Sequence, residues 1–338
     1  MVWQSGMSVA VRFGLIGVGR WGKVYLRTLL ALGDRCRLTH LGTRHPDHAA
    51  LVPYPVHVMA DWRALIEADC DAVIIAAPPH VHAEMVEACV SAGKPCIVEK
   101  PLCLDVATAE RVHARVTQAG VPVLVDHTQL FHPAYQALKR SLREAGEPVR
   151  VILAERMGSE YQKSDVPVLW DWCPHDVSLS LDLLGQDPVE IGALGGPPGA
   201  SDDPELVSLR LDFASGACAW IHAGRLASQK RRVLGVLTDT RVYVFDDLAA
   251  EKLLVSSRGP NSLPVWPQRR PWPLPSDKSS MTAMVTYFLD GLAGGERGCF
   301  GTDLALRVTR VLGTCESLLR RLEVTGQKSF DRSTRDVR

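Results

Sequence analysis

The chain has 338 residues, which is too many for one ordinary hydrophobic core and predicts about two domains. Its 38 Lys and Arg residues balance 38 Asp and Glu residues, so bulk charge favours neither nucleic acid nor a membrane surface as a partner. Its apolar runs stay shorter than the roughly 20 residues of a membrane-spanning helix. The nine cysteines form no CxxC pair and suit reduced thiols, so we expect a cytoplasmic protein.

The chain begins with MVWQSGMSVAVRFGLIG, which has no basic region before a hydrophobic stretch and no cleavage signature. We therefore expect no secretory leader. Because Met7 stands just before the first expected strand, residues 1–8 are interpreted as either a disordered lead or an alternative start.

Short apolar runs alternate with amphipathic stretches from residue 11 to about 127. The runs are VRFGLIG, CRLTHLG, DAVIIAAP, PCIVEKP and VPVLVDH, and the helices expected between them cover residues 21–32, 61–68, 81–92 and 106–119. Strands that alternate with helices of this length predict βαβ units in a parallel, doubly wound sheet. We therefore expect an α/β Rossmann-fold N-terminal domain over residues 9–128, followed by a helix over 131–146.

After Pro148 the pattern changes to long β-rich runs, namely VRVILAERM, LVSLRLDFASGACAWIHAG and RRVLGVLTDTRVYVFDD. Gly216 and Asp239-Thr240 fall where hairpin turns are needed. Helices are expected over residues 175–184, 280–292 and 302–322, and an extended surface segment over the proline-rich residues 257–277. This grouping predicts an α+β C-terminal domain over residues 129–338, with a large, mostly antiparallel open sheet.

The segment GLIGVGRWG contains Gly17-x-Gly19-x-x-Gly22 directly after an expected strand and at the start of an expected helix. Glycines here permit a tight turn and let backbone N–H groups approach a pyrophosphate, while the helix N-terminus supplies partial positive charge. We therefore expect a dinucleotide site that also includes Arg20 and Trp21. The alternative is a glycine-rich turn in an α/β domain that binds no cofactor.

The second expected strand ends in Gly42-Thr43-Arg44, where NAD-preferring folds usually place an acidic residue for the ribose 2′-hydroxyl. Asp47 comes only later. A hydroxyl followed by a guanidinium suits a 2′-phosphate better than a bare diol. NADP(H) is therefore favoured as the cofactor, with NAD(H) possible, and the alternative is that Arg44 is an ordinary exposed loop arginine.

The segment PPHVHAE places His80 and His82 where a strand gives way to a helix. An HxH pair can bind metal, but no cluster of Cys, Asp or Glu completes such a site here, so no metal is expected. We instead expect Ala77, Pro78 and His82 to shape the loop over the cofactor.

In AGKPCIVEKPLCLD, Glu99-Lys100-Pro101 follows a strand, and in this setting the chain resembles the Gfo/Idh/MocA family, which includes glucose–fructose oxidoreductase and inositol dehydrogenase. The resemblance covers nearly all of the N-terminal half and continues more weakly beyond it. It implies that Lys100 lies beside the nicotinamide and hydrogen-bonds the reacting hydroxyl or carbonyl, with Glu99 also at the cofactor. It further implies a homodimer or homotetramer formed through the C-terminal sheet.

In LWDWCPHDVS, Asp171 and His175 correspond to the family's aspartate and its acid/base histidine four residues later. The family's usual glycine-rich lead-in is replaced by PVLWDWCP. Its frequent aspartate three residues after the histidine is Ser178 here, with Asp176 next to the histidine instead, which leaves the substrate class open. The alternative is that Asp171 only caps a helix that has a proline in its first turn.

These residues suit hydride transfer to or from a secondary alcohol. His175, with an ordinary pKa of about 6.5, can exchange the hydroxyl proton. Asp171 at i−4 can orient it, and Lys100 can stabilise alkoxide character. We therefore expect an NAD(P)-dependent oxidoreductase that interconverts a secondary hydroxyl and a ketone on a sugar, nucleotide-sugar or cyclitol. The alternatives are a non-catalytic NAD(P)-binding sensor or regulator of the same fold, and a redox-assisted glycosidase.

Overall fold

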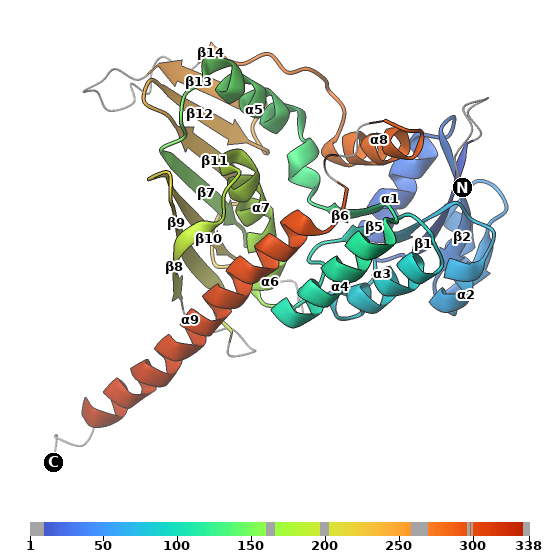
Figure 1. Cartoon of the computed structure of the whole chain (residues 1–338), viewed down its shortest axis with the longest axis horizontal. Coiled ribbons are helices and arrows are strands. Elements are labelled where there is room, and N and C mark those ends of the chain that lie inside the picture. The colour runs from blue at the N-terminus through green and yellow to red at the C-terminus, as the bar shows by residue number, and fades with distance from the viewer. Residues whose placement is uncertain are drawn as a thin grey trace. The chain divides into compact units, whose positions relative to one another are not determined.

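Figure 1 shows the computed structural model, in which the chain folds into two compact units. The described residues are 10–159, 166–196, 203–257, 270–295, 298 and 300–333, and from residue 322 only the helical backbone is described. The expected lead over residues 1–8 lies outside them, as do residues 258–269 of the expected proline-rich segment.

The first unit is discontinuous in sequence. It runs to His132 and takes in Asp277–Thr309 as well, whereas the sequence placed all residues after 128 in the second domain. The returning segment carries α8 (Ser280–Leu292), whose Phe288 is fully buried with its ring centroid 6.1 Å from that of Phe13. This helix therefore completes the apolar layer on one face of the first sheet.

The sheet of the first unit has six strands in the order β3-β2-β1-β4-β5-β6, and all of its strand pairs are parallel. This is the Rossmann strand order, with the reversal of direction between β1 and β4 that defines a ligand-binding edge. The strands are β1 (Val11–Ile16), β2 (Cys36–Gly42), β3 (His57–Met59), β4 (Ala72–Ile75), β5 (Cys96–Glu99) and β6 (Val123–Asp126).

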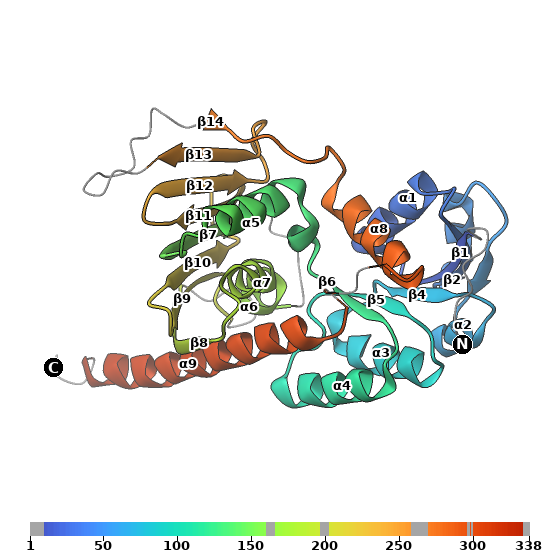
Figure 2. The same cartoon turned by 45° about the horizontal axis from the view of Figure 1, so that its top comes forward.

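Helices cover both faces of this sheet, with α1 and α8 on one face and α3 and α4 on the other (Figure 2). Because both faces are covered, the central strands are buried and almost entirely apolar. The remaining helices of the unit are α1 (Arg20–Ala31), α2 (Trp62–Glu67), α3 (His82–Ser91) and α4 (Val106–Ala119), with short 3₁₀ turns at Pro46–Leu51, Pro79–Val81 and Thr128–Phe131.

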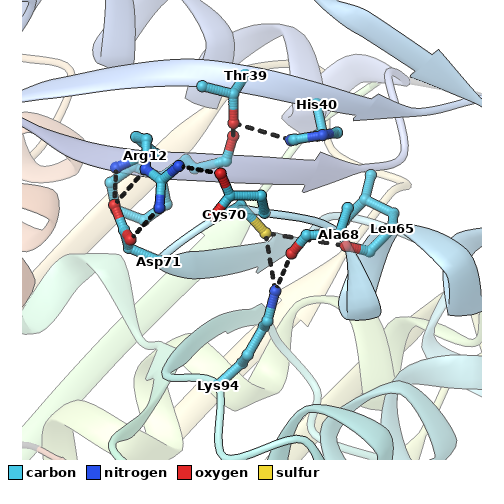
Figure 3. Close-up of polar contacts among 10 residues, drawn as sticks. Arg12, Thr39, His40, Leu65, Ala68, Cys70, Asp71 and Lys94 are labelled. Atoms are coloured by element: carbon cyan, nitrogen blue, oxygen red, sulfur yellow. Dashed lines mark hydrogen bonds and ion pairs between the residues drawn. The ribbon is translucent and has the colours of Figure 1, made fainter.

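An ion-pair cluster holds the amino ends of β1 and β4 together (Figure 3). The Arg12 guanidinium donates to both carboxylate oxygens of Asp71, and the Arg12 backbone N–H donates to Asp71 Oδ2 at 2.8 Å. Partial burial acts to raise the pKa of Asp71, but these hydrogen bonds outweigh it and lower the pKa. This cluster fixes the register of the two strands at their amino ends. Ligands bind at the opposite edge of such sheets, outside the carboxyl ends of the strands.

The second unit contains an eight-stranded mixed sheet in the order β14-β13-β12-β11-β7-β10-β9-β8. Its pairs are antiparallel except for β7 with β10, so the predicted fold class, a Rossmann unit plus an α+β unit with a mostly antiparallel sheet, is confirmed. The strands are β7 (Val151–Met157), β8 (Pro188–Gly195), β9 (Leu206–Phe213), β10 (Cys218–Gly224), β11 (Arg231–Leu237), β12 (Arg241–Asp246), β13 (Leu253–Ser257) and β14 (Arg270–Pro271).

Two hairpin turns predicted from the sequence are confirmed. Gly216, with φ +80°, connects β9 to β10, and Asp239-Thr240 lies between β11 and β12. A positive φ at position 216 explains the glycine, because other residues rarely adopt this backbone conformation.

One face of the second sheet is covered by α5 (Pro133–Ala145) and α7 (Cys173–Leu184), as Figure 2 shows. Polar contacts tie the two helices together, since Tyr135 Oη and Lys139 Nζ both donate to the Asp182 carboxylate at 2.5 and 2.8 Å. A short helix, α6 (Val168–Asp171), precedes α7, and α9 (Asp303–Ser333) ends the described chain. Within the described residues, no helix is long and apolar enough to cross a membrane.

Candidate active site

The turn between β1 and α1 leaves an open cradle at Gly19. A Cβ at Gly17, where φ is +89°, would lie 2.4 Å from the carbonyl oxygen of Ala76, and a Cβ at Gly22 would lie 2.0 Å from that of Gly17. The backbone itself therefore requires these two glycines. A Cβ at Gly19 would meet no protein atom within 4 Å, so the folded chain gives no reason for a glycine there.

The N-terminus of α1 opens onto the same turn. Gly19 is its N-cap and has no side chain with which to cap the first N–H groups of the helix. The N–H groups of a helix N-terminus, together with the helix dipole, form an anion site. An open glycine at a helix N-terminus fits the pyrophosphate of a dinucleotide, and the exposed Arg20 and Trp21 lie at this end of the helix.

The carboxyl end of β2 leads to the two residues expected to select the cofactor. The Thr43 hydroxyl is already engaged within its own loop, 3.0 Å from His48 Nδ1 and accepting from His45 N at 3.2 Å. Arg44 is exposed beside it. Of the two, Arg44 thus has its charged group available for a ligand, while Thr43 shapes the turn.

His82 connects the loop after β4 to the loop after β5. Its buried ring has Nε2 2.7 Å from the Ala77 carbonyl oxygen and Nδ1 2.8 Å from that of Pro101. Burial lowers the pKa of His82, although both hydrogen bonds act to raise it. The Ala77-Pro78 turn is thereby anchored to the backbone just after Lys100. Among the described residues, no group of His, Cys, Asp or Glu side chains is arranged to hold a metal.

Lys100 and Glu99 stand at the carboxyl end of β5, at 7% and 5% exposure. Asp126, at the end of β6, is in register with Glu99 and is 1% exposed. Tyr25 Oη and Thr128 Oγ1 donate hydrogen bonds to the two carboxylate oxygens of Asp126. Burial raises the pKa of both Glu99 and Asp126.

Tyr25 and Asp126 were not among the site residues predicted from the sequence. Asp126 could have been identified from the sequence, because it directly follows the apolar run VLV and a carboxylate at the end of a buried strand needs a polar partner.

In the second unit, Asp171 and His175 lie on two different helices. Asp171 is the last residue of α6, and His175 lies in the first turn of α7 after a break at Trp172. The spacing of four residues between them therefore does not place the two side chains on one helical face. The N-cap of α7 is Trp172, so Asp171 is not the N-cap residue of this helix.

A buried arginine holds the Asp171 carboxylate. Arg225 is 8% exposed and donates from Nη2 to Asp171 Oδ2 at 3.1 Å and to the Val166 carbonyl oxygen at 3.0 Å. Its Nη1 lies 3.5 Å from Glu205 Oε2. Asp171 keeps 30% of its side chain exposed, so its carboxylate is positioned and still accessible.

A second buried ion pair fixes the start of α7. Arg156, on β7, donates from Nε and Nη2 to the two carboxylate oxygens of Asp176, both at 2.9 Å. The two residues are only 9% and 2% exposed. In the same helix, Ser178 Oγ donates to the carbonyl oxygen of His175 at 2.8 Å. These contacts fix the first turn of α7, which carries His175.

Residues 11–127 match the model of the GFO_IDH_MocA family, described as an oxidoreductase family with an NAD-binding Rossmann fold. Over 289 residues the chain is 27% identical to UDP-N-acetylglucosamine 3-dehydrogenase of Acidithiobacillus ferrooxidans, covering 84% of this chain and 90% of that one. Over 236 residues it is 31% identical to inositol 2-dehydrogenase of Rhizobium meliloti, covering 65% and 70%.

A solved oxidoreductase structure from Magnetospirillum magnetotacticum superimposes with a TM-score of 0.82 and 39% identity, over 91% of this chain and 100% of that one. The parallel sheet, the open glycine turn and the mixed second sheet define an enzyme of the NAD-binding oxidoreductase class. Within that class, the chain belongs to the Gfo/Idh/MocA family, and the resemblance stated from the sequence is confirmed.

The open space at Gly19 gives a sharp test of the cofactor cradle. We expect Gly19→Ala to leave the free energy of unfolding almost unchanged while it weakens NAD(P)H binding roughly tenfold or more, which is about 1.4 kcal/mol. The new methyl group meets no protein atom but occupies space beside the helix N-terminus. Urea unfolding and fluorescence titration with each nucleotide measure the two quantities.

Gly22→Ala is the matched control, because its Cβ would collide with the Gly17 carbonyl. This variant should lose stability. Undiminished nucleotide affinity in Gly19→Ala would show that the cradle does not hold the cofactor.

Proposed function

We propose that this chain is an NAD(P)-dependent dehydrogenase that interconverts a secondary hydroxyl and a ketone on a sugar, nucleotide-sugar or cyclitol. The observation that carries this proposal is the buried Lys100 at the carboxyl edge of a sheet that also bears the open glycine turn. The relatives' names support the substrate class, since inositol and UDP-N-acetylglucosamine both offer ring hydroxyls. When bound, the nicotinamide supplies the hydride acceptor or donor.

Lys100 acts on the substrate oxygen. Its ammonium group donates to the hydroxyl or carbonyl and opposes the negative charge that develops as the alcohol becomes alkoxide-like. A cation that is 7% exposed exerts a stronger electrostatic effect than one in water, because solvent screens it less.

His175 accepts the hydroxyl proton during oxidation and returns it during reduction. As the O–H bond breaks toward the imidazole, the C–H electron pair leaves as hydride and the C=O bond forms, so charge and atoms balance. The bidentate Arg156–Asp176 pair and the Ser178 hydrogen bond hold the backbone at His175. Asp171, held by Arg225, offers a carboxylate that orients the substrate's neighbouring hydroxyl or the imidazole.

NADP(H) is the proposed cofactor. Arg44 is exposed at the end of β2, and the sequence has no acidic residue at this position to repel a 2′-phosphate. A guanidinium binds phosphate with paired, charge-assisted hydrogen bonds, whereas a ribose diol gains less from it.

We also propose that a second copy of the chain covers the face of the second sheet opposite α5 and α7. Trp220 on β10 pairs in register with Leu153 on β7, and the two are 37% and 46% exposed. Large apolar side chains that adjoin at the centre of a sheet are typical of an interface. Because the same patch serves both copies, the contact would be two-fold symmetric.

The His175→Asn variant tests the acid/base role. We expect turnover to fall by about 100-fold or more with little change in nucleotide affinity, because asparagine keeps the polarity but cannot exchange the proton. Steady-state kinetics on a panel of sugars, nucleotide-sugars and cyclitols measure it. His57→Asn, on the exposed edge strand β3, is the control and should keep wild-type turnover, whereas unchanged turnover in His175→Asn removes the assignment.

Arg44→Ala tests the choice of cofactor. We expect it to weaken NADPH binding roughly tenfold or more and to affect NADH far less, since only NADPH carries the 2′-phosphate. Fluorescence titration measures both affinities. Arg63→Ala, another exposed arginine in the same unit, should change neither, and equal losses for both nucleotides in Arg44→Ala would remove the case for a 2′-phosphate site.

Leu153→Glu tests the proposed interface. We expect wild-type protein to sediment as a dimer or tetramer and Leu153→Glu to sediment as a smaller species, because burying a carboxylate at the contact is costly. Leu226→Glu is the control at a similar exposure, 52%, outside the strands of the sheet. Identical sedimentation of wild type and Leu153→Glu would contradict the proposal.

A further inference from the structure

Two carboxyl groups lie buried side by side at the edge of the first sheet. Glu99 ends β5, Asp126 ends β6, and the register pairs them directly. They are 5% and 1% exposed, so the two carboxyl groups lie beside each other out of contact with water. Two carboxylates that share a buried site repel each other, so one of them keeps its proton.

The surrounding donors identify which of the two is ionised. Asp126 accepts from Tyr25 Oη at Oδ2 and from Thr128 Oγ1 at Oδ1, and both bonds favour its charged form. Glu99 Oε1 has no hydrogen-bond partner among the described residues. Two side-chain hydroxyls thus stabilise the charged form of Asp126, whereas Glu99 has one oxygen without a donor, so Glu99 is the protonated member of the pair and Asp126 the ionised one.

With one shared proton the pair carries a single negative charge, and Lys100 is the adjacent cation. Lys100 directly follows Glu99 in the chain and is itself 7% exposed. Its charge acts to lower the pKa of both acids, which places it within electrostatic reach of the pair. A buried ammonium needs a compensating charge nearby, and this pair supplies one.

We propose that Glu99 and Asp126 form a one-proton carboxyl pair that serves as the counter-charge of Lys100, with Asp126 a positioning residue that acts on Lys100 through Glu99. The counter-charge role rests on the proposed function, in which Lys100 acts on the substrate, whereas the shared proton does not. Tyr25 belongs to α1, whose N-terminus carries the glycine turn. The hydrogen bond from Tyr25 to Asp126 thus joins the dinucleotide-binding helix to the strand end that bears Lys100.

Unfolding tests the shared proton without any need for catalysis. Burial raises the pKa of these acids in the folded state. Near neutral pH, the folded chain therefore holds a proton that is released when the chain unfolds. Stability from this source is therefore lost as pH rises between the unfolded and the folded pKa. In Asp126→Asn, the amide donates to an ionised Glu99, and no proton is held.

Above the unfolded pKa of these acids, the unfolding equilibrium constant of the wild type should rise more steeply with pH than that of Asp126→Asn, by at most tenfold per pH unit, which is the limit for one proton. Asp105→Asn, which alters an exposed helix cap, should keep the wild-type slope. Equal slopes in wild type and Asp126→Asn overturn the proposal. If Asp126→Asn does not fold, the slope of Glu99→Gln is compared with that of the wild type instead. The infrared band of a protonated carboxyl in wild-type protein at neutral pH shows the shared proton without any substitution, and its absence overturns the proposal.

The pH dependence of turnover tests the counter-charge. Asp126→Asn keeps one negative charge beside Lys100, whereas Glu99→Gln/Asp126→Asn keeps none and disfavours the ammonium. We expect the pH profile of turnover to stay in place in the single variant and to move in the double variant. An unmoved profile in the double variant overturns the counter-charge role. Absence of turnover in wild type would instead reject the proposed function, and the unfolding slopes would still decide whether the pair holds its proton.

Discussion

Charge that is buried at a strand end must be compensated within hydrogen-bond reach, because removing an ion from water costs several kcal/mol that only close partners offset. Both units meet this constraint beside their candidate reacting residues. In the first unit, Lys100 lies next to the Glu99–Asp126 pair. In the second, the Arg156–Asp176 pair fixes the backbone at His175, and Arg225 holds Asp171. The interior charges therefore determine where the polar groups of the proposed reaction stand.

The glycine turn is explained by a different constraint, because backbone segments approach each other closely at two of its positions. Gly17 and Gly22 are required because a Cβ at either position would meet a carbonyl oxygen at 2.4 or 2.0 Å. Within this motif, Gly19 is the glycine that the folded chain does not require, and it lies in open space at a helix N-terminus, where anions bind in other proteins. Two glycines of the motif are thus explained by the backbone, and the third is the one that we assign to the proposed cofactor.

The sequence predicted the elements whose patterns are long and regular, and it missed those whose patterns are short or mixed. Five of the six Rossmann strands, all except β3, and both hairpin turns were predicted. β3 has only three residues, and β8 contains a proline and glycines, so neither has a clear alternation. The return of α8 to the first unit depends on contacts such as Phe288 with Phe13, which no local pattern encodes.

The candidate site shows the same division. The glycines, Lys100 and His175 were predicted because their spacing is a property of the chain, but the contacts of Tyr25 with Asp126 and of Arg225 with Asp171 join residues that are distant in sequence. The break between α6 and α7 had a local signal, since Pro174 lacks the N–H that a continuous helix would need there. That break separates Asp171 from the helix of His175. Asp171 therefore depends on Arg225 for its position, and His175 on the Arg156–Asp176 pair, so the two residues are positioned by independent contacts.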